Sequence, residues 1–190
     1  LNEYLTSFVG GGIMFLWINQ QGTSPETAAL LSNQNFRQAL NYGFDRSATV
    51  NAVNPGYKAY NRLVDSNFAG PDGGKFVDEY PVETVPLSGD GDKAKEYLAA
   101  AMEELGYSDV SQLPQLELIT WDTSEQKLLL ETIIDQWKQN LGLENIQLTQ
   151  YVIGTAIGSF YDLSYDLFAI TWETDVLPTD IMEAMVTGGE

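Results

Sequence analysis

The sequence contains no cysteine and no histidine among its 190 residues. The absence of cysteine excludes disulfide bonds and thiolate metal sites. The absence of histidine removes the most common general base and the most common metal ligand. Any hydrolytic chemistry would therefore depend on carboxylates or lysine. We expect a protein without a metal site or a cofactor.

Positive charge is also scarce. Lys and Arg number 9 against 27 Asp and Glu, which gives a formal net charge of -18. No arginine follows Arg62 and no lysine follows Lys138. Such a chain is repelled by nucleic acids and by anionic membranes, so we expect neither as a partner. The negative charge favours solubility, or it steers cationic ligands toward the protein.

The length and composition are those of a globular protein. A chain of 190 residues suits one domain or two small ones, and 44% of the residues are hydrophobic. No sequence segment reaches the roughly 20 consecutive apolar residues that span a bilayer. The chain begins at Leu1 rather than Met and ends soon after an expected helix begins. We interpret it as a piece of a longer polypeptide.

Apolar periodicity predicts an α/β fold. Runs of apolar or alternating residues predict strands at 11–19, 115–121, 145–151 and 165–172. The strand–helix–strand succession across 115–151 has short joints, which is typical of a parallel, right-handed βαβ unit. The continuous apolar run of the last strand predicts a central position in the sheet, covered on both faces.

Polar residues mark the expected helix starts. Ser24-Pro25 precedes a helix at 25–31, Asn33 or Asn35 precedes the next, and Asp45 precedes a third. Later helices are expected from Asp92 to Gly106, from Thr123 to Gly142, near 153–160, and after Pro178.

Residues 54–91 interrupt this regular pattern. Proline and glycine recur there and the periodicity is lost, which predicts a long irregular excursion on the surface. So long an irregular stretch is uncommon in a compact domain, and it indicates a functional segment or one that docks on another domain.

An ordered set of short motifs resembles a known family. The first motif is Asn35-Phe-Arg37-Gln-Ala-Leu-Asn-Tyr-Gly-Phe-Asp45-Arg46, which follows a strand ending in Asn19. The helix that ends in Leu-Gly, the βαβ unit, and the strand ending in Trp172-Glu-Thr-Asp175 follow in the same order. Together they resemble the bacterial extracellular solute-binding proteins of family 5, which are the oligopeptide-, dipeptide- and nickel-binding proteins of ABC importers.

This resemblance implies a fold and a function. The fold would be a periplasmic-binding-protein-like lobe, with a mostly parallel sheet flanked by helices, from a two-lobed type II binding protein. Residues 1–190 would form its C-terminal-half lobe, and the remaining lobe would belong to the same polypeptide. The protein would be a lipoprotein or periplasmic protein outside the cell membrane. It would capture a peptide by lobe closure and deliver it to ABC permease subunits, without acting as an enzyme.

The resemblance also assigns ligand-binding residues. Asp175 would pair with the α-amino group of a peptide, and Trp172 would form an apolar pocket wall. Trp17 and Phe15 lie where family members line the cleft, and Ile153 lies where some members carry a pocket aromatic. Structural roles are open alternatives, because a carboxylate can cap a helix and aromatic residues pack in cores.

The remaining candidates are weaker. Trp121 ends another strand and is a looser ligand contact. We interpret Arg37, Asp45 and Arg46 as structural residues, because aspartate caps helices and arginines satisfy carbonyl groups.

The chain departs from the family at one point. Some peptide binders place arginines shortly before the strand-end tryptophan to hold the ligand carboxylate, whereas this chain has Phe160 and Ala169 there. Long peptides held by their backbone, peptides anchored from the other lobe, and a neutral ligand such as an oligosaccharide are all compatible with this change. A carboxylate-dependent glycosidase and a scaffold domain without a small ligand are further hypotheses.

Overall fold

The computed structural model describes residues 12–54, 56–64, 66 and 68–173. Its strands are β1 (Gly12–Ile18), β2 (Leu116–Trp121), β3 (Ile146–Tyr151) and β4 (Leu167–Glu173). Its helices are α1 (Pro25–Ser32), α2 (Gln34–Tyr42), α3 (Arg46–Val53), α4 (Phe76–Glu79), α5 (Gly91–Leu105), α6 (Ser124–Leu141) and α7 (Ile153–Tyr161), with a 3₁₀ turn at Val110–Gln112. All four expected strands are therefore present in this part of the chain.

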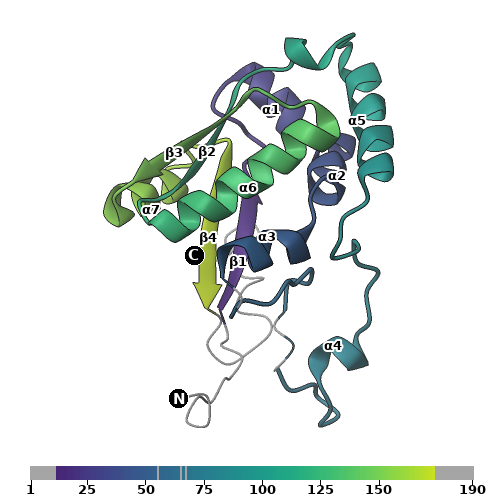
Figure 1. The fold of residues 1–190 in the computed structure, drawn as a ribbon, viewed down its shortest axis with the longest axis vertical. Helices are drawn as coiled ribbons and strands as arrows, with labels where there is room; N and C mark the ends of the chain where they lie inside the picture. Colours follow the sequence, from purple (N-terminus) through teal and green to yellow (C-terminus); the bar gives the residue numbers. More distant parts are fainter. Residues whose placement is uncertain (1–11, 55, 65, 67, 174–190) are drawn as a thin grey trace. The chain divides into compact units, whose positions relative to one another are not determined.

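The strands form one sheet in the order β1-β4-β2-β3 (Figure 1). The β2 strand pairs in parallel with β3 on one side and with β4 on the other. The β1 arrow points opposite to β4, and Asn19 after β1 donates its backbone N–H to the carbonyl of Asp166 before β4 (2.9 Å). The sheet is therefore mostly parallel, as expected, with one antiparallel edge strand.

The central position of β4 is also confirmed. It lies between β1 and β2, and Leu167, Phe168, Ala169 and Ile170 are all buried. The neighbouring β2 strand carries buried Leu118 and Ile119 on opposite faces, because successive side chains alternate across a strand. Helices α6 and α7 both contact β2 and β3.

The described residues divide into two compact units. The larger unit contains residues 16–54, 56–61 and 85–170 and therefore holds most of the sheet and the helices that cover it. In the smaller unit, residues 68–84 are mostly irregular apart from the single turn of α4. The Glu79 carboxylate there accepts backbone hydrogen bonds from Asp72 (3.2 Å) and Gly74 (2.8 Å), which holds the glycine-rich loop around it.

Helix starts follow the expected capping chemistry at four positions. The side chains of Ser24, Asn33, Asp45 and Thr123 each accept a hydrogen bond from a backbone N–H three residues later. Each bond satisfies one of the free N–H groups in the first turn of a helix. The choice between Asn33 and Asn35 as the cap of α2 is thereby resolved in favour of Asn33.

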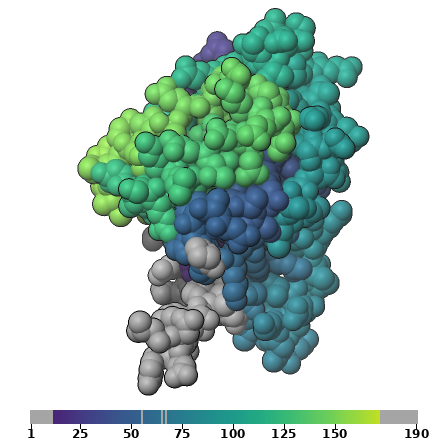
Figure 2. Space-filling model, in the orientation of Figure 1, coloured from purple at the N-terminus to yellow at the C-terminus, as the bar shows by residue number. Residues whose placement is uncertain are grey.

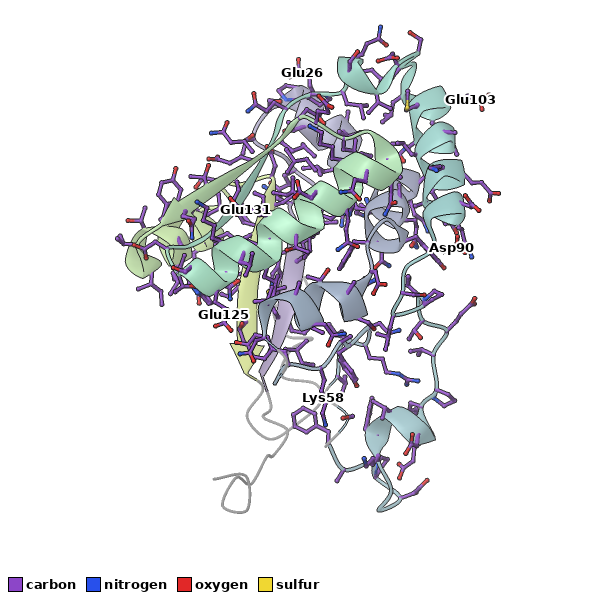
Figure 3. The ribbon with its side chains drawn as sticks, in the orientation of Figure 1. Glu26, Lys58, Asp90, Glu103, Glu125 and Glu131 are labelled. Carbon is purple, nitrogen blue, oxygen red and sulfur yellow. The ribbon has the colours of Figure 1, made fainter. Side chains whose placement is uncertain are left out.

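The expected start of α5 at Asp92 is wrong. Asp90 is the cap, and its carboxylate accepts from the N–H of Lys93 (3.0 Å); Figure 3 labels Asp90 at the start of α5. The reason is a tertiary contact, because the N–H of Asp90 donates to the carbonyl of Tyr42 (2.9 Å). Gly89 permits this approach, since it has φ +68° and a Cβ there would lie 2.6 Å from the carbonyl oxygen of Phe44.

The motif that begins at Asn35 has a structural role in the fold. Arg37 donates to the carbonyls of Leu31 (2.8 Å) and Ser32 (2.7 Å) at the end of α1. Arg46 donates to Asn41, and its guanidinium lies 4.3 Å from the ring centre of Phe44. Both arginines thus satisfy backbone carbonyls or neighbouring side chains, as we expected of them.

One buried carboxylate joins three segments at the start of β4. Asp166 is 2% exposed, and its Oδ1 accepts from both the N–H and the hydroxyl of Thr23 (2.9 Å each). Its Oδ2 accepts from the N–H of Glu117 in β2 (3.1 Å). Three donors thus converge on one buried carboxylate, and hydrogen bonds to carboxylates are among the strong ones in proteins. They fix the β1–α1 connection against the centre of the sheet.

Replacing this carboxylate should therefore destabilise the protein. Asp166→Asn substitutes an amide that cannot accept from Thr23 and Glu117 at the same time, which leaves one buried donor unsatisfied. We expect the free energy of unfolding to fall by about 1–3 kcal/mol, measured by urea denaturation. Asp135→Asn, on the exposed side of α6, is the matched control and should change it by less than about 0.5 kcal/mol. Equal midpoints for the two variants would contradict this account of Asp166.

Candidate functional site

The carboxyl ends of the parallel strands define the candidate site. Trp121 and Tyr151 end β2 and β3 in register with each other, and the N–H of Asp122 donates to the carbonyl of Tyr151 (2.9 Å). The β4 strand runs parallel to β2, so its carboxyl end points to the same edge. Ligands of open α/β sheets bind outside the carboxyl ends of the strands.

An aromatic cluster fills the space beneath this edge. The ring of Phe160 in α7 lies 5.5 Å from that of Trp17 in an edge-to-face arrangement. It also lies 5.8 Å from Tyr165 and 5.2 Å from Phe168, measured between ring centres. Trp121 and Tyr151 pack against the same cluster. Such pairs stabilise a fold beyond the area they bury, so the cluster holds α7 against the sheet.

The structure brings some of the expected site residues together. Trp17 is partly buried in the aromatic cluster, and Trp121 lies at the strand end above it. Ile153 opens α7 two residues after β3 and is 59% exposed. Trp121 and Ile153 thus lie at the carboxyl end of the sheet, whereas Trp17, two residues before Asn19, lies nearer the start of β4. Trp17 packs as the structural alternative predicts, and its contact with a ligand stays a prediction.

The structure says less about the surroundings of the other expected site residues, Phe15, Trp172 and Asp175. Phe15 lies in β1, is partly buried, and is not among the described members of the aromatic cluster. Trp172 lies within β4, which extends to Glu173. Asp175 and the helix expected after Pro178 lie outside the described residues. The roles of all three site residues remain predictions.

Sequence reasoning missed the residues that form the cluster. The sequence singles out Phe160 only because some relatives carry arginine there, and it predicts Tyr165 as the start of a strand. The signal was available in α7, where Ala156 and Phe160 are four residues apart and face the core. The same spacing places Ile153, Ile157 and Tyr161 on another face, and all three are exposed.

The charge that follows β2 at this edge is negative, since Asp122 is exposed there. Asp162 is also exposed, but it caps the far end of α7. In the part of the chain that the structure describes, no group of three acidic residues is arranged to hold a metal ion. Nor is any helix of that part long and apolar enough to cross a bilayer.

The sequence matches a known family. The family model described as "Bacterial extracellular solute-binding proteins, family 5 Middle" matches residues 2–189. The chain belongs to this family. The oligopeptide-binding protein OppA of Bacillus subtilis is 27% identical over 145 residues, which are 76% of this chain and 25% of OppA. The dipeptide-binding protein of Lactococcus lactis is 25% identical over 190 residues, covering 98% of this chain and 34% of that protein.

Solved structures share the fold of this family 5 chain. The structure of Listeria monocytogenes OppA bound to peptide superimposes with a TM-score of 0.83 at 22% identity, over 99% of this chain and 36% of that one. The pheromone receptor PrgZ superimposes with a TM-score of 0.77 at 23% identity, over 97% of this chain and 35% of that one. The chain thus spans about a quarter to a third of the length of its relatives.

The aromatic cluster has a measurable consequence at alkaline pH. Burial raises the pKa of the Tyr165 phenol above its ordinary value. The folded state therefore keeps the proton that the unfolded state releases, and stability falls once the pH rises above about 10. We expect Tyr165→Phe to lose less stability than wild type between about pH 8 and pH 10.5, as measured by urea denaturation. Tyr161→Phe, which removes an exposed phenol from α7, is the control. An unchanged alkaline loss in Tyr165→Phe would contradict this role of burial.

Proposed function

We propose that this chain forms one lobe, the C-terminal half, of the substrate-binding component of an ABC importer that captures peptides. The match to the family 5 model over residues 2–189 carries the proposal, together with relatives that are named for oligopeptide and dipeptide binding. The family consists of extracellular solute-binding proteins. The protein therefore acts at the outer face of the cell membrane or in the periplasm.

The proposed chemistry of capture uses the carboxyl edge of the sheet. An ammonium group held by the Asp175 carboxylate gains charge-assisted hydrogen bonds, which strengthen when lobe closure excludes water. Trp172, Trp17, Phe15 and Ile153 supply apolar contacts for the side chains of the peptide. Closure then presents a liganded form to the permease subunits. No bond of the ligand is broken, so the protein is a binding component and not an enzyme.

Peptides are a better-supported ligand class than oligosaccharides. Both of the curated relatives compared above are named as peptide binders. The aromatic cluster would serve sugar stacking only where ring faces are open, and Trp17 is already packed edge-to-face with Phe160. Oligosaccharide binding is compatible with the same fold. The titration experiment therefore includes oligosaccharides as a separate set of ligands.

Calorimetric titration of the full-length polypeptide that contains these residues tests the proposal. The protein is titrated with a pool of peptides three to eight residues long, and separately with a panel of oligosaccharides. Heat with peptides alone is expected. Heat with sugars alone would move the function to carbohydrate uptake, and heat with neither would contradict a role in peptide or sugar capture.

The assignment of Asp175 has its own test. Asp175→Asn removes the charge that would hold the α-amino group, so peptide binding should weaken by about 1–3 kcal/mol. Acetylation of the peptide amino terminus should weaken binding to the wild-type protein by a similar amount and should add little to the variant. Asp135→Asn on α6 is the control. Unchanged affinity in Asp175→Asn would remove this residue from the site.

A further inference from the structure

The chain contains two pairs in which glycine directly follows aspartate, and their surroundings differ in the structure. The pairs are Asp72-Gly73 and Asp90-Gly91. In such a pair the backbone nitrogen of the glycine can attack the side-chain carboxyl of the aspartate, because glycine has no Cβ that would shield this nitrogen. The function proposed above uses neither pair. The local structure therefore decides which of the two is open to this reaction.

Asp72 lies in an exposed turn, and its carboxylate is unpaired. Residues 71–75 are all exposed, and Figure 2 shows the blue-green atoms of this part of the chain at the surface. Gly73 has φ +86°, and a Cβ added there would meet nothing within 4 Å, so no side chain covers the peptide bond between the two residues. Among the described residues, the only hydrogen bond of Asp72 runs from its backbone N–H to Glu79 (3.2 Å).

A single hydrogen bond of the turn opposes ring closure at Asp72. The N–H of Gly73 donates to the carbonyl of Gly70 (3.1 Å), and this bond is lost when the nitrogen joins the side chain. Water replaces an exposed bond of this kind at little cost, because its net contribution to stability is small. The N–H of Asp72 takes no part in ring closure, so its bond to Glu79 does not have to break.

Three hydrogen bonds protect Asp90. Its carboxylate caps α5 by accepting from the N–H of Lys93 (3.0 Å). Its carbonyl accepts from the N–H of Ala94 (2.9 Å), and its own N–H donates to the carbonyl of Tyr42 (2.9 Å). Ring closure turns the carboxyl group back onto the main chain, so the cap bond must break first. Asp90 should therefore react more slowly than Asp72, although both residues are exposed.

We propose that Asp72 is a site of covalent modification, at which aspartate converts to isoaspartate without an enzyme. The nitrogen of Gly73 forms a bond to Cγ of Asp72, the bond from Cγ to its hydroxyl breaks, and the hydroxyl leaves with the amide proton as water. Water then adds to the cyclic imide. Opening at Cγ restores aspartate, whereas opening at the main-chain carbonyl leaves the peptide bond on the side chain. One water molecule is released and one is consumed, so the reaction requires no other reagent.

The modification alters the loop around Glu79. Isoaspartate adds one methylene group to the main chain between the N–H groups of Asp72 and Gly74. In the unmodified chain these two groups bind the two carboxylate oxygens of Glu79, at 3.2 and 2.8 Å. The longer chain no longer presents both donors at the spacing of one carboxylate. We therefore expect the amide hydrogens of residues 70–79 to exchange faster after modification.

Incorporation of heavy oxygen into the full-length polypeptide tests the proposal. Each cycle of ring closure and hydrolysis in water enriched in heavy oxygen places one labelled oxygen at the reacting aspartate. The folded protein is incubated at about pH 6, where a small fraction of aspartate carboxyls is protonated and can lose water. Trypsin then separates the two pairs, because cleavage after Arg62, Lys75 and Lys93 leaves one pair in residues 63–75 and the other in 76–93. Fragment ions in mass spectrometry locate the label.

The two pairs serve as controls for each other. In the folded protein, label should enter at Asp72 about fivefold or more faster than at Asp90, the factor expected from breaking one capping bond. In urea the cap is lost, and the two sites should take up label at similar rates. The 63–75 peptide should also give a second chromatographic species of equal mass, which is its isoaspartate form. Asp72→Glu keeps the charge but requires a larger ring, so it should abolish labelling at this position and leave Asp90 unaffected.

Several results would overturn the proposal. Equal rates at the two sites of the folded protein, or faster labelling at Asp90, would show that the cap gives no protection. Absence of label at Asp72 during a period in which the unfolded chain is labelled would show that the turn prevents ring closure. Label at position 72 in Asp72→Glu, or a 63–75 peptide without an isoaspartate form, would exclude the cyclic imide. None of these results bears on peptide capture, which the calorimetric titration tests separately.

Discussion

The buried carboxylate of Asp166 is the interaction on which the rest of the structure depends. It accepts three hydrogen bonds from Thr23 and Glu117, and it lies directly before the central strand of the sheet. A carboxylate that is 2% exposed is stable only when its oxygens are satisfied in this way. Asn19 completes the joint, since its side-chain amide donates to the carbonyls of Leu163 (3.0 Å) and Tyr165 (2.9 Å). Segments more than 140 residues apart in the chain are thereby held at one end of the sheet.

The aromatic cluster lies next to this joint, because Phe168 is two residues after Asp166 and Trp17 is two residues before Asn19. With β4 fixed between β1 and β2, the rings of Trp17, Phe160 and Phe168 pack together and hold α7 on the sheet. Leu163, at the end of α7, has a left-handed backbone with φ 52°, a conformation that is costly for a residue other than glycine. The Asn19 amide holds its carbonyl, so the same joint also fixes the end of α7. The start of β4 and the end of α7 are thus held by the same side chain.

Local chemistry made most of the fold predictable from the sequence. The caps at Ser24, Asn33 and Asp45 depend on bonds to residues three positions away, and the strands depend on short apolar runs. Features that depend on distant partners were not predictable in this way. The role of Asp166 was not predictable, because the residue lies within an expected strand and its partners are 49 and 143 residues away. The cap of α5 was misplaced because a carbonyl of α2 selects Asp90, and the role of Phe160 depends on a tryptophan from β1.

Amide hydrogen exchange of the full-length protein, with and without a bound peptide, tests the central claim most directly. The account holds that a peptide meets the carboxyl end of the sheet. It predicts new protection in α7 and at the carboxyl end of β4, while α2 and α5 exchange as in the free protein. Protection confined to α2 and α5, or to no part of these 190 residues, would contradict the placement of the ligand at this edge.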